Sequence, residues 1–104
     1  MLKLIDACEQ NDAKLAFKLI ENKANIDLQD EDGHSALMMS CSNDDKKIAL
    51  KLIENKANID LKNKEEWTAL LYSCHHNNTE LALKLIENKA NIDLQNNDGW
   101  TALM

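Results

Sequence analysis

The chain of 104 residues contains no arginine, valine or proline, and only 4% of its residues are aromatic. The absence of arginine, together with a net charge of −6, argues against nucleic-acid binding, which needs a basic surface. No apolar run approaches the ~20 residues that a membrane-spanning helix requires. Residues 1–10 include acidic side chains and no continuous apolar stretch, so they do not resemble a secretory signal peptide. We therefore predict that the chain binds neither nucleic acid nor a membrane.

Motifs of catalysis and ligand binding are also missing. The chain has no glycine-rich phosphate loop, no Gly-x-Ser-x-Gly and no convergent pair of carboxylates. Cys74, His75 and His76 resemble a metal or nucleophile cluster, but consecutive helical side chains diverge by about 100°. A zinc site would also need three or four ligands at spacings that the chain lacks. We interpret both histidines as surface residues, with metal binding or partner contact as alternatives, and we predict no enzyme, no cofactor and no metal.

What the chain does contain is a repeat of fixed length. The segment KLIENKANIDLQ occupies residues 18–29, recurs at 51–62 with lysine in the last position, and returns unchanged at 84–95, so successive copies begin 33 residues apart. A unit of this length cannot bury its apolar face alone and must stack on its neighbours. The chain has room for about three units, which is near the minimum for a self-supporting stack.

The first half of one unit, residues 30–62, carries the signals of a turn followed by a helix. Residues 30–33 are turn formers, in which Asp can hydrogen-bond the backbone and Gly can adopt positive φ. Ser35 fits a helix N-cap, as Thr68 and Thr101 do one and two units later. We therefore predict a short first helix from residue 36 to about residue 43.

The second half of the unit predicts another turn, a second helix and a return. Asp44 and Asp45 interrupt the first helix, and Asp and Asn are the best non-glycine residues for a left-handed helix end. Residues 46–54 place apolar side chains at helical spacing and predict the second helix. Residues 58–61 are predicted to be a short extended segment that leads to the next turn.

These residues resemble the ankyrin repeats. The family pattern D-x-x-G-x-T-P-L-H-x-A-A, followed by a second helix and L-L-x-x-G-A-x-x-N, lies in phase over residues 30–60. SALM at 35–38 and TALL at 68–71 take the place of TPLH, and LIENKANID takes the place of the later motif. The resemblance covers essentially the whole chain. It implies an all-α, ankyrin-type solenoid of stacked helix-turn-helix units, with short β-hairpin loops that project from the stack.

The repeat phase divides the chain into four parts that form a single domain, 1–104. They are an N-terminal capping unit, 1–29, full repeats at 30–62 and 63–95, and the truncated start of a further repeat at 96–104. Because the last part stops four residues into a helix, we expect the chain to be a segment of a longer array.

Glycine is replaced at positions where the ankyrin pattern has it. Lysine follows the second helix in every unit, at Lys23, Lys56 and Lys89, and Glu66 replaces the turn glycine of the middle hairpin. If the lysine positions keep positive φ, each of these residues costs roughly 1–2 kcal/mol. We expect the stack to be less stable than the family pattern would make it.

The three cysteines are one structural position that occurs three times. Cys8, Cys41 and Cys74 lie 33 residues apart, and stacked helices are separated by ~8–10 Å, beyond the ~7 Å limit for a disulfide. We predict that all three are buried between helices as reduced, small apolar side chains. Unpaired thiols favour a reducing compartment, so we expect a cytoplasmic location.

The sequence varies between repeats at the hairpin tips and at the ends of the first helices. In ankyrin proteins these positions form the concave recognition surface, and the resemblance assigns to it Glu31, Asp32, His34, Lys64, Glu65, Trp67, His75, His76, Asn97, Asp98 and Trp100. Tryptophan is enriched at binding hot spots, although each indole could instead pack on the neighbouring hairpin. The acidic residues predict a partner that offers apolar side chains flanked by lysine or arginine.

The leading hypothesis is a module that binds a partner protein through its concave face and hairpin tips. One alternative is a scaffold or self-assembling segment, with possible end-to-end association through the exposed end of the stack. Phe17, Leu50 and Leu83, which lie off the main apolar stripe, would then form a lateral interface, although packing between repeats is the usual explanation for such residues. A further alternative is a non-catalytic regulatory arm of a larger protein.

Overall fold

The computed structural model describes residues 4–22 and 25–102. Within them the chain forms six α-helices in three pairs: α1 (Leu4–Glu9) with α2 (Ala13–Glu21), α3 (Ala36–Ser42) with α4 (Lys46–Glu54), and α5 (Ala69–His75) with α6 (Thr79–Glu87). None of the described residues lies in a β-strand. The predicted helices of the unit 30–62 are confirmed, and α3 ends one residue before its predicted end.

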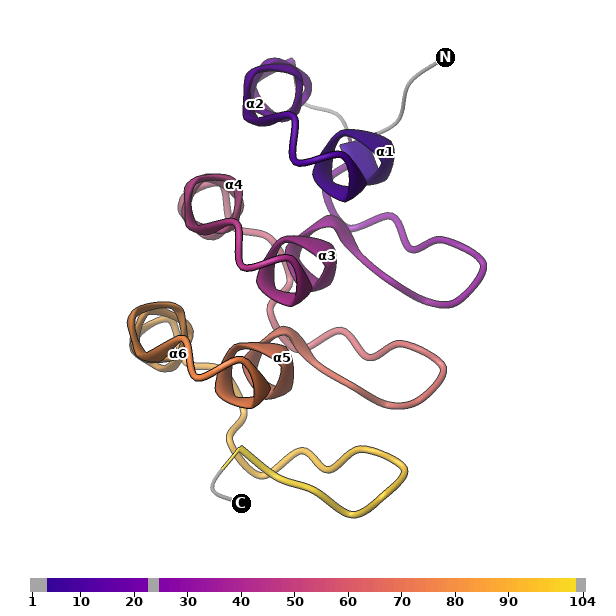
Figure 1. Ribbon diagram of the computed structural model, residues 1–104, viewed down its shortest axis with the longest axis vertical. Helices are drawn as coiled ribbons and strands as arrows, with labels where there is room; N and C mark the ends of the chain where they lie inside the picture. Colours follow the sequence, from indigo (N-terminus) through magenta and orange to yellow (C-terminus); the bar gives the residue numbers. More distant parts are fainter. Residues whose placement is uncertain (1–3, 23–24, 103–104) are drawn as a thin grey trace.

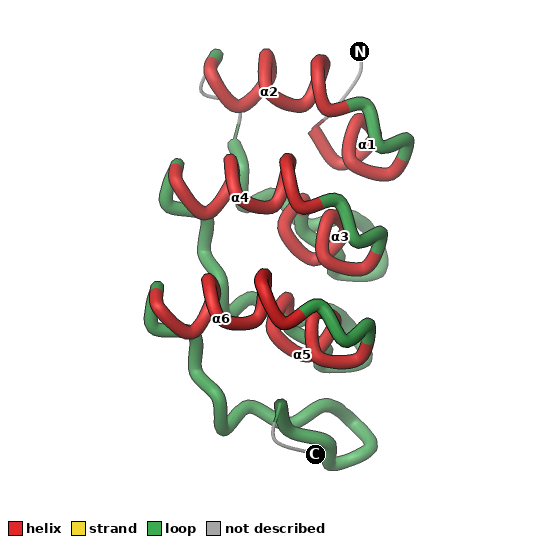
Figure 2. Tube along the Cα trace, turned by 60° about the vertical axis from the view of Figure 1, so that its left-hand side comes forward, coloured by secondary structure: helices red, strands yellow, loops and turns green. Residues whose placement is uncertain are grey.

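The helices form two columns, which Figures 1 and 2 show from different sides. One column contains α1, α3 and α5, and the other contains α2, α4 and α6. Each helix packs on its pair partner and on the next helix of its own column. The loops that join the pairs project from one side of the stack in Figure 1. We call residues 30–34, 63–67 and 96–100 of these loops the first, second and third fingers.

The core lies between the two columns and is built from the apolar stripe of each helix. Leu52 and Ile48 of α4 are completely buried, as is Leu81 of α6. Leu37 of α3 and Leu70 of α5 are 1% and 2% exposed. Each buried leucine or isoleucine contributes about 1.5–3 kcal/mol through removal of its side chain from water. Because the stripes recur with the sequence, Leu52 and Leu85 occupy equivalent places one unit apart, and both are completely buried.

Side-chain caps fix where the helices begin. The Ser35 hydroxyl accepts a hydrogen bond from the Met38 N–H at 3.2 Å, and the Thr68 hydroxyl accepts one from the Leu71 N–H at 3.2 Å. Both predicted N-caps are therefore confirmed, and each satisfies a backbone donor that the first helical turn leaves free. The helix predicted to follow Thr101 extends outside the described residues.

Non-glycine residues occupy left-handed backbone conformations at equivalent places in the units. Asp44 has φ of 59° between α3 and α4, as predicted from its residue type. Lys56, Lys89 and Glu66 have φ of 67°, 69° and 63°. The positions where glycine is replaced thus keep positive φ, and each replacement carries the corresponding backbone cost. Lys23, which was expected to do the same, lies outside the described residues.

The prediction of an extended segment at residues 58–61 was wrong, because Ile59 and Asp60 form a turn. The side chain of Asn58 accepts a hydrogen bond from the Asp60 N–H at 3.1 Å, and such an Asx turn competes with extended backbone. The Asn58 N–H donates to the Asp27 carboxylate of the preceding unit at 2.8 Å. The Asn91 N–H donates to the Asp60 carboxylate at 2.9 Å. This turn therefore links neighbouring units.

The prediction that all three cysteines are buried holds for two of them. Cys8 and Cys41 are completely buried, whereas Cys74 is half-buried, and all three are free thiols. Ser40 and Ser73, each from the following unit, hydrogen-bond the thiols of Cys8 and Cys41. No described residue takes this place beside Cys74. Burial raises the pKa of the Cys8 and Cys41 thiols to about 11.

The three residues off the main apolar stripe do not share one environment. Phe17 and Leu50 are half-buried and pack against the core. The Lys51 ammonium of the next unit lies 5.5 Å from the centre of the Phe17 ring, a cation–π contact between repeats. Leu83 is 55% exposed. Packing between repeats therefore accounts for Phe17 and Leu50.

Candidate recognition site on the fingers

One side-chain oxygen closes each finger. In the second finger, the Asn63 oxygen accepts hydrogen bonds from the N–H groups of Glu65 at 3.0 Å and Trp67 at 2.9 Å. The Asn63 N–H in turn donates to the Trp67 carbonyl at 3.1 Å. Asp30 and Asn96 close the first and third fingers in the same way. The fingers turn back on themselves as hairpin loops were predicted to do. Two backbone hydrogen bonds close each finger, and in the second finger the other bond is donated by the Glu66 N–H to the Asn63 carbonyl at 2.9 Å. None of the three fingers forms a strand.

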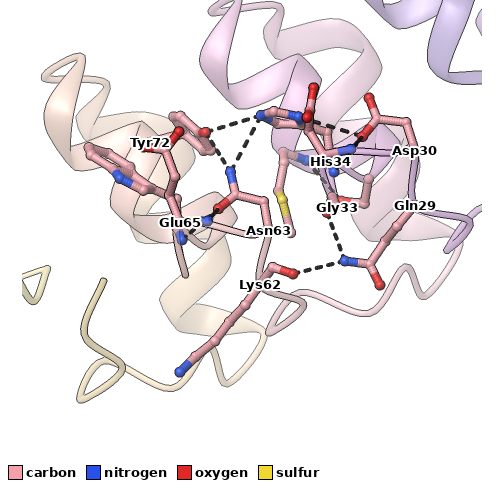
Figure 3. Close-up of polar contacts among 12 residues, drawn as sticks. Gln29, Asp30, Gly33, His34, Lys62, Asn63, Glu65 and Tyr72 are labelled. Carbon is pink, nitrogen blue, oxygen red and sulfur yellow. Dashed lines mark hydrogen bonds and ion pairs between the residues drawn. The ribbon is translucent and has the colours of Figure 1, made fainter. Parts of the chain in front are cut away.

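Backbone contacts hold the fingers side by side. The Lys64 N–H donates to the Asp32 carbonyl at 3.0 Å, and the Asn97 N–H donates to the Glu65 carbonyl at 3.1 Å. The Gln29 amide donates to the carbonyls of Gly33 at 2.7 Å and Lys62 at 2.9 Å (Figure 3). The three fingers are therefore aligned with one another, so that their last residues occupy equivalent places. These last residues are His34, Trp67 and Trp100.

Tyr72 of α5 joins the first and second fingers (Figure 3). The Asn63 amide donates to its hydroxyl oxygen at 2.8 Å, and the His34 Nε2 lies 3.3 Å from that oxygen. A phenol can donate as well as accept, so the Tyr72 hydroxyl can donate to the His34 Nε2. The His34 Nδ1 lies 3.7 Å from the Asp30 carboxylate.

A row of aromatic rings continues from Tyr72 along α5. The Trp67 ring stacks on Tyr72 with a centroid distance of 4.8 Å and a tilt of 30°. The Trp67 and His75 rings are nearly perpendicular, with centroids 5.4 Å apart, and the centroids of the His75 and His76 rings lie 5.2 Å apart. Trp67 is half-buried by these contacts. Trp100 is 53% exposed and has no ring contact among the described residues.

A cavity of about 600 Å³ lies between the second and third fingers. The residues that line it are Trp67, Leu71, Cys74, His75, Asn96, Asp98, Trp100, Thr101 and Ala102. Two indoles and the side chains of Leu71 and Ala102 make its wall largely apolar, and Asp98 adds a carboxylate. The cavity extends to Thr101 and Ala102, the last residues that the structure describes.

The predicted site residues fall into separate groups. Trp67, His75, Asp98 and Trp100 meet around the cavity. His34 belongs to the network of Tyr72, and His76 contacts His75. The remaining residues are exposed on the fingers: Glu31, Asp32, Lys64, Glu65 and Asn97. The structure thus places all the predicted residues on the fingers, on α5 or at its C-cap, but only four of them border the cavity.

Sequence reasoning missed Tyr72, Asn63 and Asn96, which organise this region. The two asparagines had a usable signal, because the repeat phase puts Asp30, Asn63 and Asn96 at one equivalent position, and their side-chain oxygens can hydrogen-bond the backbone two residues on. Tyr72 had no comparable signal. Met39 occupies its equivalent position in the preceding unit, so the phenol occurs only once in the repeats.

Asp30, Asp32 and His34 bring ligand atoms within 4.8 Å of one another. The loop geometry explains this cluster without a metal. One oxygen of Asp30 already accepts the N–H groups of Asp32 and His34, each at 2.9 Å. Uncharged Asn63 makes the same two kinds of bond in the second finger. The position of Asp30 is therefore set by the need to close the finger.

The paired helices, the two columns and the projecting fingers define a helical repeat protein in which each unit packs on its neighbours. The family profile of ankyrin repeats (three copies) matches residues 4–96, and the chain belongs to the ankyrin-repeat family. Ankyrin repeats are generally protein–protein interaction modules and are typically non-catalytic. No curated protein matches the chain. Among the described residues, no helix is both long enough and apolar enough to cross a membrane.

Proposed function

We propose that the chain binds a partner protein through the concave face formed by its fingers and first helices, with Trp67 and Trp100 at its centre. The observation that carries this proposal is the alignment of the three fingers, which bonds from the Lys64 N–H to the Asp32 carbonyl at 3.0 Å and from the Asn97 N–H to the Glu65 carbonyl at 3.1 Å hold side by side. Trp67 and Trp100 end the second and third of these fingers, and tryptophan is enriched at binding hot spots.

The charge around the fingers supports a partner with basic and apolar side chains. Glu31, Asp32, Glu65 and Asp98 are exposed on the three fingers, and the whole chain carries a net charge of −6. Lysine or arginine on the partner would meet these carboxylates at the rim of the interface. The association rate should therefore fall as the salt concentration rises. The free thiols support a reducing, cytoplasmic location for this interaction.

The test compares two alanine variants against a partner isolated by pull-down. Trp100→Ala should weaken binding by about 2 kcal/mol if Trp100 is a hot spot, with little change in the thermal midpoint because its ring makes few contacts. Leu83→Ala is the matched control, since Leu83 is 55% exposed on α6 and does not line the cavity. Equal affinities of the two variants would contradict the proposed face.

Trp67 needs a separate measurement because its ring is part of the fold. It stacks on Tyr72 at 4.8 Å, so Trp67→Ala removes packing as well as surface. We expect this variant to lower both the affinity and the thermal midpoint. A lower midpoint with unchanged affinity would assign Trp67 to packing alone.

Self-association is the second candidate. Phe17 and Leu50, which lie off the main apolar stripe and are half-buried, would form part of a lateral interface between copies of the chain. Sedimentation velocity over a range of protein concentrations separates the two functions. A module that binds a different protein stays monomeric, whereas a self-assembling segment grows with concentration.

A further inference from the structure

The outer face of α4 carries a lysine and a glutamate that have no partner among the described residues. Residues of a helix are 100° apart, so Lys47 and Glu54 point within about 20° of each other. They lie opposite Ala49 and Leu52, which are completely buried. Both charged residues are exposed although α4 has α2 on one side and α6 on the other. This face is therefore open in a helix whose two neighbours in the column are both present.

The spacing of the two charges prevents them from pairing within the helix. Seven residues are two helical turns, or about 10.5 Å, whereas charged side chains of one helix pair at a spacing of three or four residues. Other charges of the same column find a partner in a neighbouring unit. Lys46 lies 3.4 Å from Glu80, and Lys51 lies 3.9 Å from Glu21. The outer face of α4 thus keeps one unpaired charge of each sign at a fixed separation.

An apolar side chain lies between the two charges. Leu50 is half-buried and follows Lys47 by about one turn of α4. The helix α2 repeats the arrangement one unit earlier, with Lys14, Phe17 and Glu21 at the equivalent positions. Phe17 is also half-buried, and the two charged residues of α2 are exposed. The order along the outer face of both helices is therefore basic, apolar, acidic.

We propose that the outer faces of α2 and α4 bind the same faces of a second copy of the chain in a two-fold symmetric dimer. A face whose charges reverse along the helix is complementary to itself after a rotation of 180°. A two-fold axis along the stack sets α4 antiparallel to α4 of the second copy. Each Lys47 then lies opposite the Glu54 of the other copy, and the two Leu50 side chains meet between them. This inference rests on self-association, the second candidate function, and gives it a geometry.

The third unit does not take part in this contact. Glutamate occupies both charged positions of α6, and each glutamate already has a lysine: Glu80 lies 3.4 Å from Lys46, and Glu87 lies 4.0 Å from Lys84. The contact is therefore limited to two helices of each copy. A small interface with exposed charges predicts a weak dimer whose affinity falls as the salt concentration rises. The fingers stay uncovered, because the column of α2, α4 and α6 lies on the other side of the stack (Figure 1).

The experiment measures the mass of the full chain by sedimentation equilibrium over a range of concentrations. Lys47→Glu and Glu54→Lys each place like charges opposite each other at both ends of the α4 contact. Each variant alone should therefore dimerise about tenfold more weakly than the wild type. An equimolar mixture of the two variants restores opposite charges at both ends and should recover the affinity of the wild type. A variant that failed to fold could not be rescued in this way.

Glu31→Lys is the matched control, because it changes the net charge as Glu54→Lys does but lies on the first finger. It should leave the dimer unchanged. A mass that rises beyond two chains would overturn the proposal. So would single variants that dimerise like the wild type, or a mixture that stays as weak as either variant. In those cases the two-fold geometry fails and self-association stands, whereas a monomer at all concentrations refutes both.

Trp100→Ala separates this proposal from binding through the fingers. The variant should weaken a captured partner and leave the dimer unchanged, because Trp100 lies on the third finger and not on α2 or α4. Loss of the dimer in this variant would move the contact between copies to the fingers and would contradict the outer-face geometry. Failure of the charge variants to affect the dimer, by contrast, leaves the proposed role of the fingers unchanged.

Discussion

Gly33 and Gly99 form a matched pair for testing how the fingers are held together. Both lie at the same position of a finger and have positive φ, 84° and 79°. A Cβ atom added at Gly33 would lie 2.8 Å from the Asn63 Cα and 3.0 Å from the Lys64 nitrogen, whereas one added at Gly99 would meet nothing within 4 Å. Alanine therefore encounters the same backbone strain at both positions but a steric clash at only one.

The two costs can be estimated separately. Left-handed backbone costs a non-glycine residue about 1–2 kcal/mol, offset by about 0.4–1 kcal/mol because alanine restricts the unfolded chain. Gly99→Ala should accordingly cost about 0.5–1 kcal/mol. Gly33→Ala adds about 1–3 kcal/mol of overpacking against the second finger and weakens the bond from the Lys64 N–H to the Asp32 carbonyl. Its total should be about 2–4 kcal/mol.

Urea unfolding followed by far-ultraviolet circular dichroism measures both variants against the wild type. We expect the free energy of unfolding to fall by at least about 1.5 kcal/mol more for Gly33→Ala than for Gly99→Ala. Equal losses, or a larger loss at Gly99, would show that backbone strain alone sets the glycine requirement. The close approach of the first two fingers would then have no energetic importance.

Three other measurements address the core. Cys74 should react with a thiol reagent in the native state before Cys8 and Cys41, because only its side chain is half-exposed; equal rates would contradict the packing. Burial raises the pKa of Cys8 and Cys41 from 9.0 to about 11, so the folded protein retains protons that the unfolded chain loses in this range. The free energy of unfolding should therefore fall as pH rises from about 9 to 11, and replacement of both cysteines by alanine should flatten this dependence. Leu52→Ala removes a completely buried side chain and should cost about 2–5 kcal/mol in urea unfolding, with a cost below about 1 kcal/mol as the contrary result.

The architecture could be predicted because nearby residues specify each helix and each cap, and the same residues recur in every unit. The apolar spacing of residues 46–54 and the polar residues before each helix specify α4 and the caps without reference to distant parts of the chain. Lys56 replaces a glycine of the family pattern and has positive φ, so the condition stated for the lysine positions is met there. The turn at Ile59 was missed because the Asn58 side chain competes with extended backbone, and residue pattern alone does not show which of the two forms.

The candidate site could be predicted only in outline. The variable positions identify the fingers. Tyr72 joins two fingers because its hydroxyl contacts Asn63 in its own unit and His34 in the preceding one. Which side chains meet there depends on how the fingers align, and that alignment is visible only in three dimensions. The burial of Cys74 was predicted from its equivalence to Cys8. Burial also depends on which residues cover a side chain, and Cys74 is only half-buried.

The bonds between units have a consequence for how such a chain changes length in evolution. The Asn58 N–H binds the Asp27 carboxylate, and one unit later the Asn91 N–H binds the Asp60 carboxylate. Residues 18–29 and 84–95 are identical, so these units present nearly the same surface to a neighbour. A recombination event that deletes or duplicates 33 residues would join two faces that already match. The gene can therefore gain or lose whole units while the remaining interfaces, and the alignment of the fingers, are inherited unchanged.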